Sequence, residues 1–373
     1  MGFKKLGELT DQSLRELNSI QEGKKLLVKT GFPMIDDHLN GLLPSDIVVL
    51  SGLSGHGKSE TLSRLRDNIM NVDINPEAKD YIWANFNLEV RSFNVTLRSL
   101  NRKLGKKKQD ILYNSFTEDE KAKVKEFYDD AQDERQYVCQ DNITALDFYE
   151  ASRELLLANK DRKAVHIDCD HVALLSGNDI QKGIEDLIRY VNKLKLEFDN
   201  VYFYIVSQLN RSLLGRVAEK NNNACPNASD LYASSAMDFI SSYNIIVFDA
   251  HKLGISEFMQ VTPDRYGYLS SHFTDPNSKD KVSFHTEGKL FYKVVKTRES
   301  DVSWRDLYIV EKDISKEEKN IYKKEKGIEF KKSISHQMPV FQKNLPEPVP
   351  LNNDLSLAFG DGQDDIDEND VPF

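Results

Sequence analysis

The sequence predicts an α/β fold, with a mostly parallel sheet covered by helices on both faces. Apolar runs rich in β-branched and aromatic residues recur along the 373-residue chain, at 46–52, 81–86, 164–168, 201–208, 244–250, 290–296 and 306–312. Stretches with helical character alternate with many of these runs. Strands that are apolar along their whole length are typical of parallel sheets, because both faces of such a sheet are buried.

Helices are predicted from periodicity and from capping signals. Periodic stretches occupy 10–22, 58–71, 93–103 and 180–198. Two further helices are expected to begin at threonines that are followed three residues later by an acid, Thr117 with Glu120 and Thr144 with Asp147. In such a capping box the two side chains satisfy backbone N–H groups that a helix start leaves without partners.

Composition divides the chain into three parts. Residues 1–27 hold a short linker helix at 10–22, whose narrow apolar stripe needs a surface on its own chain or on a neighbour. Residues 28–312 hold all the predicted strands and form the globular domain. Residues 313–373 are rich first in Lys and Glu, then in Pro, Gly and Asp, which predicts a poorly ordered acidic tail.

Acidic residues gather in that tail. The formal net charge is −10, but residues 344–373 contain eight acids and no Lys or Arg, so the first 343 residues carry 52 acids and 50 bases. A body so close to neutrality excludes a dominant basic surface for duplex DNA. The three cysteines form no disulfide framework, no apolar run approaches the roughly 18 residues of a membrane helix, and the start lacks a secretory signal. We therefore expect a cytoplasmic protein with no membrane partner.

A phosphate-binding loop joins the first apolar run to the helix at 58–71. The segment 52–59, GLSGHGKS, fits G-x-x-x-x-G-K-[ST] at every fixed position and lies between a strand and a helix, as the motif requires. Glycines let backbone N–H groups turn toward an anion, and the helix presents its positive end to it. We expect Lys58 to bind the β- and γ-phosphates and Ser59 to ligate Mg²⁺. The residues expected to contact ATP or another NTP are Gly52, Ser54, Gly55, His56, Gly57, Lys58, Ser59 and Glu60.

Two acids are candidates for the remaining chemistry of a nucleoside triphosphatase. Asp168 ends the run at 164–168 and is predicted to be the second magnesium ligand, with a cap on the next turn as its alternative role. Glu89 follows the run at 81–86 and is a candidate base for the attacking water. A glutamate at a strand end is commonly a solvated charge, so the spacing alone leaves that alternative open.

Read together, these segments resemble the RecA-like ATPase core of DnaB-type replicative helicases, from about residue 30 to about residue 298. NLEV, 87–90, resembles the family's Ser-Leu-Glu-Met segment and implies that Glu89 is the hydrolytic base. HIDCDHVALL, which begins at residue 166, resembles its Walker-B strand. SQLNR, which begins at residue 207, resembles the segment whose glutamine senses the γ-phosphate, and this implies that role for Gln208.

A basic element near the end of the resemblance implies a ring. KTR, 296–298, resembles the family's Lys-x-Arg element, which reaches the nucleotide of the neighbouring subunit. The resemblance makes Arg298 the finger and Lys296 its companion, in a homo-oligomer expected to be hexameric. An arginine supplied in trans stabilises charge on the transferring phosphoryl group. A solvated basic pair at a strand end is the alternative.

The sequence also departs from the family's pattern. Only some 27 residues precede the core, so the N-terminal helical domain that meets primase and the loader is not expected here. In the segment that resembles Ser-Asp-Leu-Arg-Glu-Ser, Tyr232 and Ala233 stand where the family usually has Arg and Glu. These departures put the grip on DNA in doubt more than the nucleotide site.

Single-stranded DNA is expected to contact a few loop residues of each subunit. The best candidates follow Gln208 and are Arg211, Arg216 and Lys220. A channel lined by repeated subunits multiplies a few cations per chain, so a mildly acidic protein can still hold a strand. A flexible, solvated loop is the alternative interpretation.

The end of the chain, DIDENDVPF, resembles the acidic tip of bacterial single-stranded DNA-binding proteins. Such a tip docks a terminal Phe and its carboxylate in an apolar pocket rimmed by basic residues. We therefore expect Asp370, Val371, Pro372 and Phe373 to dock replication proteins. A solubilising tail, or a tail that occupies the DNA channel of its own ring, are the alternatives.

The leading hypothesis is a ring-forming, ATP-driven helicase that translocates on single-stranded DNA in replication, using ATP (or another NTP) and Mg²⁺. An architecture without an accessory domain would suit a phage-encoded protein acting in a bacterial host. The alternative is a recombination or annealing ATPase of the RecA class, which forms filaments or loads partners on single-stranded DNA and unwinds nothing. A third hypothesis is an adaptor that uses nucleotide only as a switch.

Overall fold

The fold is described from a computed structural model. Two compact units divide the chain, Met1–Lys316 and Glu317–Phe373, and the second lies wholly outside the described residues. The described residues are 5–22, 27–32, 35–36, 41–175, 179–210, 212–218, 226–231, 237, 239–255, 257–262, 265–270, 282–297 and 307–311. The predicted residues Arg211, Lys220 and Arg298 and the tail from 313 to 373 therefore lie outside them.

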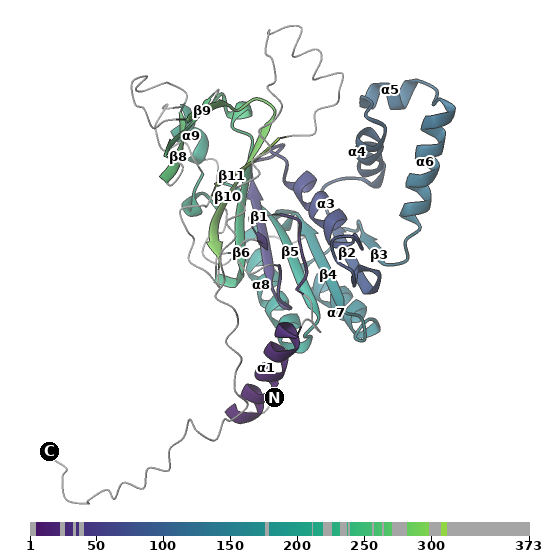
Figure 1. The fold of residues 1–373 in the computed structure, drawn as a ribbon, viewed down its shortest axis with the longest axis vertical. Helices are drawn as coiled ribbons and strands as arrows, with labels where there is room; N and C mark the ends of the chain where they lie inside the picture. The colour runs from purple at the N-terminus through teal and green to yellow at the C-terminus, as the bar shows by residue number, and fades with distance from the viewer. Residues whose placement is uncertain are drawn as a thin grey trace, which may run out of the picture. The chain divides into compact units, whose positions relative to one another are not determined.

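One large sheet forms the centre of the first unit (Figure 1). Its eight strands run in the order β11-β10-β6-β1-β5-β4-β2-β3. The strands are β1 (Ile47–Gly52), β2 (Tyr81–Asn87), β3 (Gln136–Cys139), β4 (Ala164–Asp170), β5 (Val201–Gln208), β6 (Tyr243–Phe248), β10 (Lys289–Thr297) and β11 (Leu307–Glu311). All pairs from β6 to β3 are parallel, and β10 is antiparallel to both β6 and β11. The predicted, mostly parallel sheet is confirmed.

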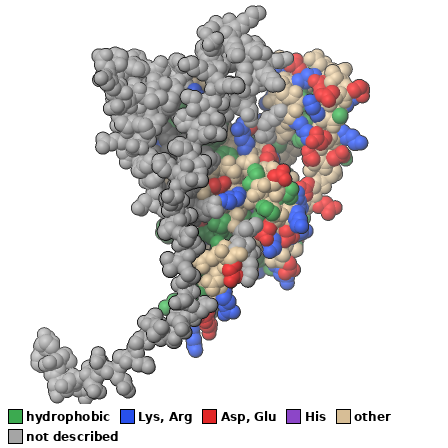
Figure 2. All heavy atoms as spheres, in the orientation of Figure 1, with side chains coloured by type: hydrophobic (Ala, Val, Ile, Leu, Met, Phe, Trp, Pro, Cys, Tyr) green, Lys and Arg blue, Asp and Glu red, His purple; other side chains and the backbone are tan. Residues whose placement is uncertain are grey.

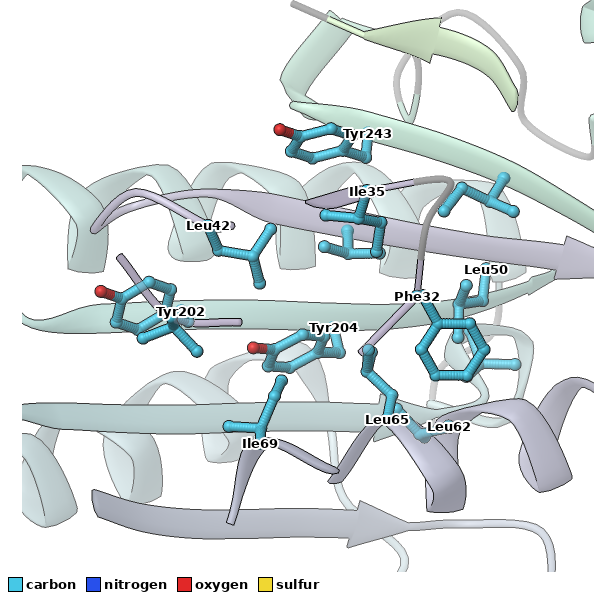
Figure 3. Close-up of a cluster of buried hydrophobic side chains, with 14 of the residues drawn as sticks. Phe32, Ile35, Leu42, Leu50, Leu62, Leu65, Ile69, Tyr202, Tyr204 and Tyr243 are labelled. Atoms are coloured by element: carbon cyan, nitrogen blue, oxygen red, sulfur yellow. The ribbon is translucent and has the colours of Figure 1, made fainter. Parts of the chain in front are cut away.

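Helices cover both faces of this sheet, as predicted. On one face α3 (Lys58–Ile69) packs with the described residues Val28, Phe32, Ile35 and Leu42 over a core cluster that Figure 3 shows in close-up. Phe32, Leu62 and Leu65 contribute to it from these covering segments, and Tyr204 contributes from the sheet. On the other face lie α7 (Ala145–Ala158) and α8 (Ile180–Glu197). The buried residues of α8 recur at helical spacing, at Ile184, Leu187, Val191 and Leu194.

Three helices between β2 and β3 form a separate packed group beside that edge of the sheet (Figure 1). They are α4 (Ser92–Leu104), α5 (Lys108–Tyr113) and α6 (Glu118–Ala131), and α4 packs on both of the others. The predicted capping box of Thr117 and Glu120 begins α6, and Glu120 also pairs with Lys106 at 2.7 Å. The second predicted capping box, at Thr144, begins α7.

The remaining elements are short or peripheral. The helix α1 (Leu6–Gln21) matches the predicted linker helix, and its Leu6 and Leu14 are exposed. A second, antiparallel sheet has the order β8-β7-β9 and comprises β7 (Glu257–Thr262), β8 (Arg265–Ser270) and β9 (Val282–His285). The helix α9 (Ser212–Ala218) follows β5. Among the described residues, no helix combines the length and the hydropathy needed to cross a bilayer.

Candidate nucleotide site

The ends of four adjacent strands bring the predicted site residues together. The strands β1, β5, β4 and β2 are neighbours and parallel, so their carboxyl ends meet at one edge of the sheet. In the register, Gly52 of β1 lies opposite Gln208 of β5, and Asp170 of β4 lies opposite Asn87 of β2. Open parallel sheets bind ligands at this edge, because loops and helix N-termini converge there.

Backbone geometry explains two glycines of the phosphate loop. A Cβ on Gly52 would lie 2.4 Å from the carbonyl oxygen of Val247, so this position accepts no side chain without moving the backbone. Gly57 has φ +95° and directly precedes the first residue of α3. That left-handed conformation is easy for glycine and lets the loop turn into the helix. The loop therefore has the close-packed, glycine-dependent shape that a phosphate cradle requires.

Two contacts from the segment that follows β6 hold the phosphate loop in place. The Nδ1 atom of His56 accepts a hydrogen bond from the backbone N–H of Asp249 at 3.0 Å, and His56 is buried. Lys252 Nζ donates to the carbonyl oxygen of Gly55 at 2.6 Å. The predicted contact of His56 with nucleotide is therefore better explained as packing of the loop against the segment after β6.

Lys58 supplies a buried cation to the site. It is 6 % exposed, and its Nζ donates to the carbonyl oxygen of Leu53 at 3.1 Å. Burial lowers the pKa of Lys58, while the nearby carboxylates Asp170 and Glu89 oppose that effect. A partly desolvated ammonium beside a loop of inward N–H groups gains strongly from a bound polyphosphate.

Two aspartates of β4 share a face, and only one of them reaches the phosphate loop. Asp170 lies close enough to Ser59, the predicted magnesium ligand, for the serine hydroxyl to lower its pKa, and its Oδ1 is buried without a hydrogen-bond partner among the described residues. Burial raises the pKa of Asp170, and the hydroxyl of Ser59 opposes the shift. Asp168 and Asp170 are two residues apart in a strand, so both point to the face of α3, and Asp170 lies nearer the loop.

Asp168 is instead engaged inside the sheet. Its two carboxylate oxygens accept hydrogen bonds from Trp83 Nε1 and Asn85 Nδ2, both at 2.5 Å. Asp168 is 1 % exposed, and burial raises its pKa to about 7. Asp170 is therefore the better candidate for the second magnesium ligand than the predicted Asp168, because both oxygens of Asp168 already have partners while Asp170 Oδ1 has none among the described residues. The sequence does carry a signal for Asp170, because it lies two residues after Asp168 and an extended strand places both on the same face.

Three polar side chains, Gln208, His171 and Glu89, lie together at the same edge of the sheet. Gln208 Nε2 lies 3.1 Å from His171 Nε2, and the same ring nitrogen lies 3.9 Å from Glu89 Oε2. Glu89 is partly open to solvent, with a side chain that is 42 % exposed. Burial lowers the pKa of His171, which keeps the ring neutral near neutral pH. The structure thus brings Glu89, the predicted base, close to Gln208, the predicted sensor, with His171 between them. No role for His171 was predicted from the sequence.

These groups line one cavity of about 330 Å³. Its walls include Ser54, Gly55, Gly57, Lys58, Ser59, Glu60, Glu89, Asp168, Asp170 and Gln208. Asn85, Arg66, Arg98 and Ser99 also line it and were not predicted. The arginines are single residues on α3 and α4 without a motif, so only the packing of these helices places them at the cavity.

The residues present fit a magnesium-bound nucleoside triphosphate. A glycine-dependent loop, a buried lysine and a serine hydroxyl beside a buried carboxylate are the donor set that such a ligand requires. Hard oxygen ligands such as Ser59 and Asp170 are those that Mg²⁺ prefers.

Arg216, predicted to contact DNA, is engaged within the chain. Its guanidinium donates to both carboxylate oxygens of Asp230, at 2.7 and 2.5 Å, and Asp230 is completely buried. A bidentate pair with a buried partner fixes the arginine in place, so Arg216 is better explained as a structural link between α9 and the segment 226–231. On the visible face in Figure 2, basic and acidic side chains of the described residues are interspersed, notably over α5 and α6.

Comparison with known proteins agrees with this architecture. The family described as the DnaB-like helicase C terminal domain matches residues 28–253. The fold is similar to a solved structure described as an ATPase domain, with a TM-score of 0.60 and 16% identity over 83% of this chain and 95% of that one. It is also similar to a structure described as a DnaB-like replicative helicase and its interactions with primase, with a TM-score of 0.56 and 15% identity over 83% of this chain.

This chain spans 64% of the length of that second structure's chain. None of the curated protein sequences compared with the chain matches it significantly. Both structural similarities are below 25% identity and speak for the fold. The family's match covers more than half of the chain, and its residues form the sheet edge described above. The chain therefore belongs to the family of DnaB-like helicase C-terminal domains.

Proposed function

We propose that this protein is an ATP-driven DNA helicase that translocates on single-stranded DNA as a hexameric ring during replication, with NTP hydrolysed between subunits. The observation that supports it most is the meeting of Lys58, Ser59, Asp170, Glu89 and Gln208 at one edge of the sheet. These are the group types that hold a polyphosphate, ligate a metal ion and activate water.

Each of these residues has a role that follows from its place. Lys58 binds the β- and γ-phosphates, and Ser59 with Asp170 holds Mg²⁺, which supplies charge neutralisation for phosphoryl transfer when it is bound. Glu89 is partly solvent-exposed at the mouth of the cavity, where it orients and deprotonates the attacking water. Gln208 ends β5 directly opposite Gly52 and contacts the γ-phosphate.

The sheet supports a finger that acts in trans. Leu290, at the start of β10, lies next to Gly57, whose added Cβ would be 3.2 Å from the leucine side chain. Lys296 pairs in register with Asn244, near the start of β6, because β10 is antiparallel. Six residues of strand span about 20 Å, so Lys296 lies far from the nucleotide edge of its own subunit. A basic element there does not reach the nucleotide of its own subunit, which supports a role at a neighbouring subunit's nucleotide, and we propose this role for Lys296 and Arg298.

A chain of contacts joins the nucleotide edge to the predicted DNA loop. After Gln208, Leu209 forms a β-bridge with Leu231, and the backbone N–H of Asn210 donates to the carbonyl oxygen of Asp230 at 2.6 Å. Asp230 in turn holds Arg216 of α9. These contacts give Gln208 a physical connection to α9, and we propose that the flanking residues Arg211 and Lys220 contact single-stranded DNA.

The tail proposal rests on sequence alone. Asp370, Val371, Pro372 and Phe373 end the chain in the order of acid, apolar residue, proline and aromatic ring that fits a basic-rimmed apolar pocket. We propose that this tip recruits replication proteins. Removing these four residues should abolish such binding and leave DNA-stimulated ATP hydrolysis intact.

The proposed function is tested by ATP hydrolysis and duplex unwinding with and without single-stranded DNA. We expect stimulation by DNA and ATP-dependent unwinding in the wild-type protein. Lys58→Ala should lose nucleotide binding, whereas Glu89→Ala should bind nucleotide and lose turnover by more than about a hundredfold. A protein that hydrolyses ATP and unwinds nothing, and that forms continuous filaments on DNA in electron micrographs, would instead be a RecA-class recombination ATPase.

The shared site is tested by mixing subunits. Arg298→Ala subunits should poison wild-type rings, because each variant subunit disables its neighbour's site. Arg298→Ala subunits that keep full activity and do not poison mixed rings would refute hydrolysis between subunits.

A further inference from the structure

A buried histidine lies between the proposed base and the proposed sensor. His171 directly follows Asp170 and is 4 % exposed. Its Nε2 atom is 3.1 Å from the side-chain amide nitrogen of Gln208 and 3.9 Å from Oε2 of Glu89. Its Nδ1 atom is buried and has no hydrogen-bond partner among the described residues. One ring nitrogen therefore faces both functional side chains.

A neutral imidazole at this position can hydrogen-bond through Nε2 to Gln208 or to Glu89, but not fully to both. Such a ring has one N–H donor and one acceptor nitrogen. When the Gln208 amide donates to Nε2, the ring proton is on Nδ1, the lone pair of Nε2 is occupied by Gln208, and the ring offers no hydrogen to Glu89. When Nε2 carries the proton, it donates either to the amide oxygen of Gln208 or to Glu89. A ligand that draws Gln208 away from His171 therefore frees Nε2–H to donate a hydrogen bond to Glu89.

We infer that His171 is a positioning residue that couples γ-phosphate sensing by Gln208 to the orientation of Glu89, an inference that rests on the proposed function. Without a γ-phosphate, Gln208 has its amide oxygen turned to the ring, Nε2–H of His171 donates to that oxygen, and Glu89 lacks this donor. When Gln208 turns to a γ-phosphate, the N–H of His171 donates to Glu89 and fixes its carboxylate. The base is then set only in subunits that hold a triphosphate.

The test is His171→Phe, which keeps a planar ring and removes both nitrogens. Two quantities are measured, kcat for ATP hydrolysis with single-stranded DNA and the ratio of the Kd for ADP to the Kd for a non-hydrolysable ATP analogue. We expect kcat to fall about tenfold, the effect of losing one hydrogen bond to a charged group. The ratio is measured with Glu89→Ala present in every protein compared, so that the lost hydrogen bond to Glu89 does not offset the effect. We expect the ratio to rise by about two- to tenfold, because Gln208 no longer has to leave His171.

A fall in kcat together with a rise in the affinity ratio distinguishes a lost link between Gln208 and Glu89 from general distortion of the site. A distorted site would lower both kcat and the preference for the triphosphate analogue. In Gln208→Ala the added His171→Phe change should leave the ratio where the first substitution put it, because both break the same link. His166→Phe is the matched control. This histidine of β4 is also buried with one unpartnered nitrogen, but its other nitrogen bonds Tyr204, away from Gln208. Its effects should multiply with those of Gln208→Ala.

A ratio that is unchanged or lowered in His171→Phe overturns the inference, as does a double variant whose effects multiply. The ratio is an equilibrium measurement and needs no turnover. If the wild-type protein shows no DNA-stimulated hydrolysis but His171→Phe still raises the ratio, the proposed function is refuted while the link between His171 and Gln208 stands.

Discussion

Asp168→Asn distinguishes a structural carboxylate from a catalytic one. Asp168 is inaccessible to solvent, accepts hydrogen bonds from Trp83 and Asn85, and has a pKa raised by burial from 3.8 to about 7. The folded protein thus binds this proton more tightly than the unfolded chain does. The stability that the group contributes is fully present below about pH 4 and is lost as the pH rises through 7.

The size of the effect follows from the shift. Since one pKa unit corresponds to about 1.36 kcal/mol, the raised pKa costs the folded state at most about 4 kcal/mol when the carboxyl is ionised. Between pH 5 and pH 7 the free energy of unfolding should fall by about 2 kcal/mol in the wild-type protein relative to Asp168→Asn, which has no titratable group there.

Urea unfolding followed by circular dichroism at pH 5, 6, 7 and 8 measures this difference. ATP hydrolysis at pH 8 completes the comparison, because Asp168→Asn should keep activity within about tenfold while Asp170→Asn should lose more than about a hundredfold. Stability curves that stay parallel across pH would refute the buried, proton-binding Asp168. Equal losses of hydrolysis in the two variants would refute the assignment of the magnesium acid to Asp170.

Three further substitutions test the loop and the link to α9. Gly52→Ala forces the backbone near Val247 to move and should abolish nucleotide binding and cost about 3 kcal/mol of unfolding free energy or more. Gly55→Ala, whose Cβ would meet open space at φ +74°, should cost less, about 1 to 2 kcal/mol, and equal losses would contradict the clash. Arg216→Ala removes both guanidinium bonds from the buried Asp230 and should cost about 3 to 5 kcal/mol by thermal or chemical unfolding, whereas an arginine that serves mainly DNA would lose DNA affinity at unchanged stability. Adding Asp230→Asn to Arg216→Ala should recover part of the lost stability, because it removes the buried charge. A further loss in the double variant would show that the unpaired Asp230 is not the cause of the destabilisation.

Much of the architecture was predictable because each parallel strand is buried on both faces and reads as an apolar run. The run at 201–208 coincides with β5, and the capping boxes at Thr117 and Thr144 begin helices as expected. The strand β3 was missed because it is four residues long and largely exposed at the edge of the sheet. Such a segment carries almost no burial pattern.

Local chemistry in the sequence alone determined that a phosphate loop follows the first strand. Spacing specifies that motif, since the glycines, Lys58 and Ser59 lie within eight residues. Only the tertiary structure decided between Asp168 and Asp170, because both point to the same face of β4 and differ in which neighbour each reaches. It also decided that Arg216 serves Asp230 and that His171 lies between Glu89 and Gln208. These outcomes depend on strand order and register, which join residues far apart in the chain and which local periodicity does not encode.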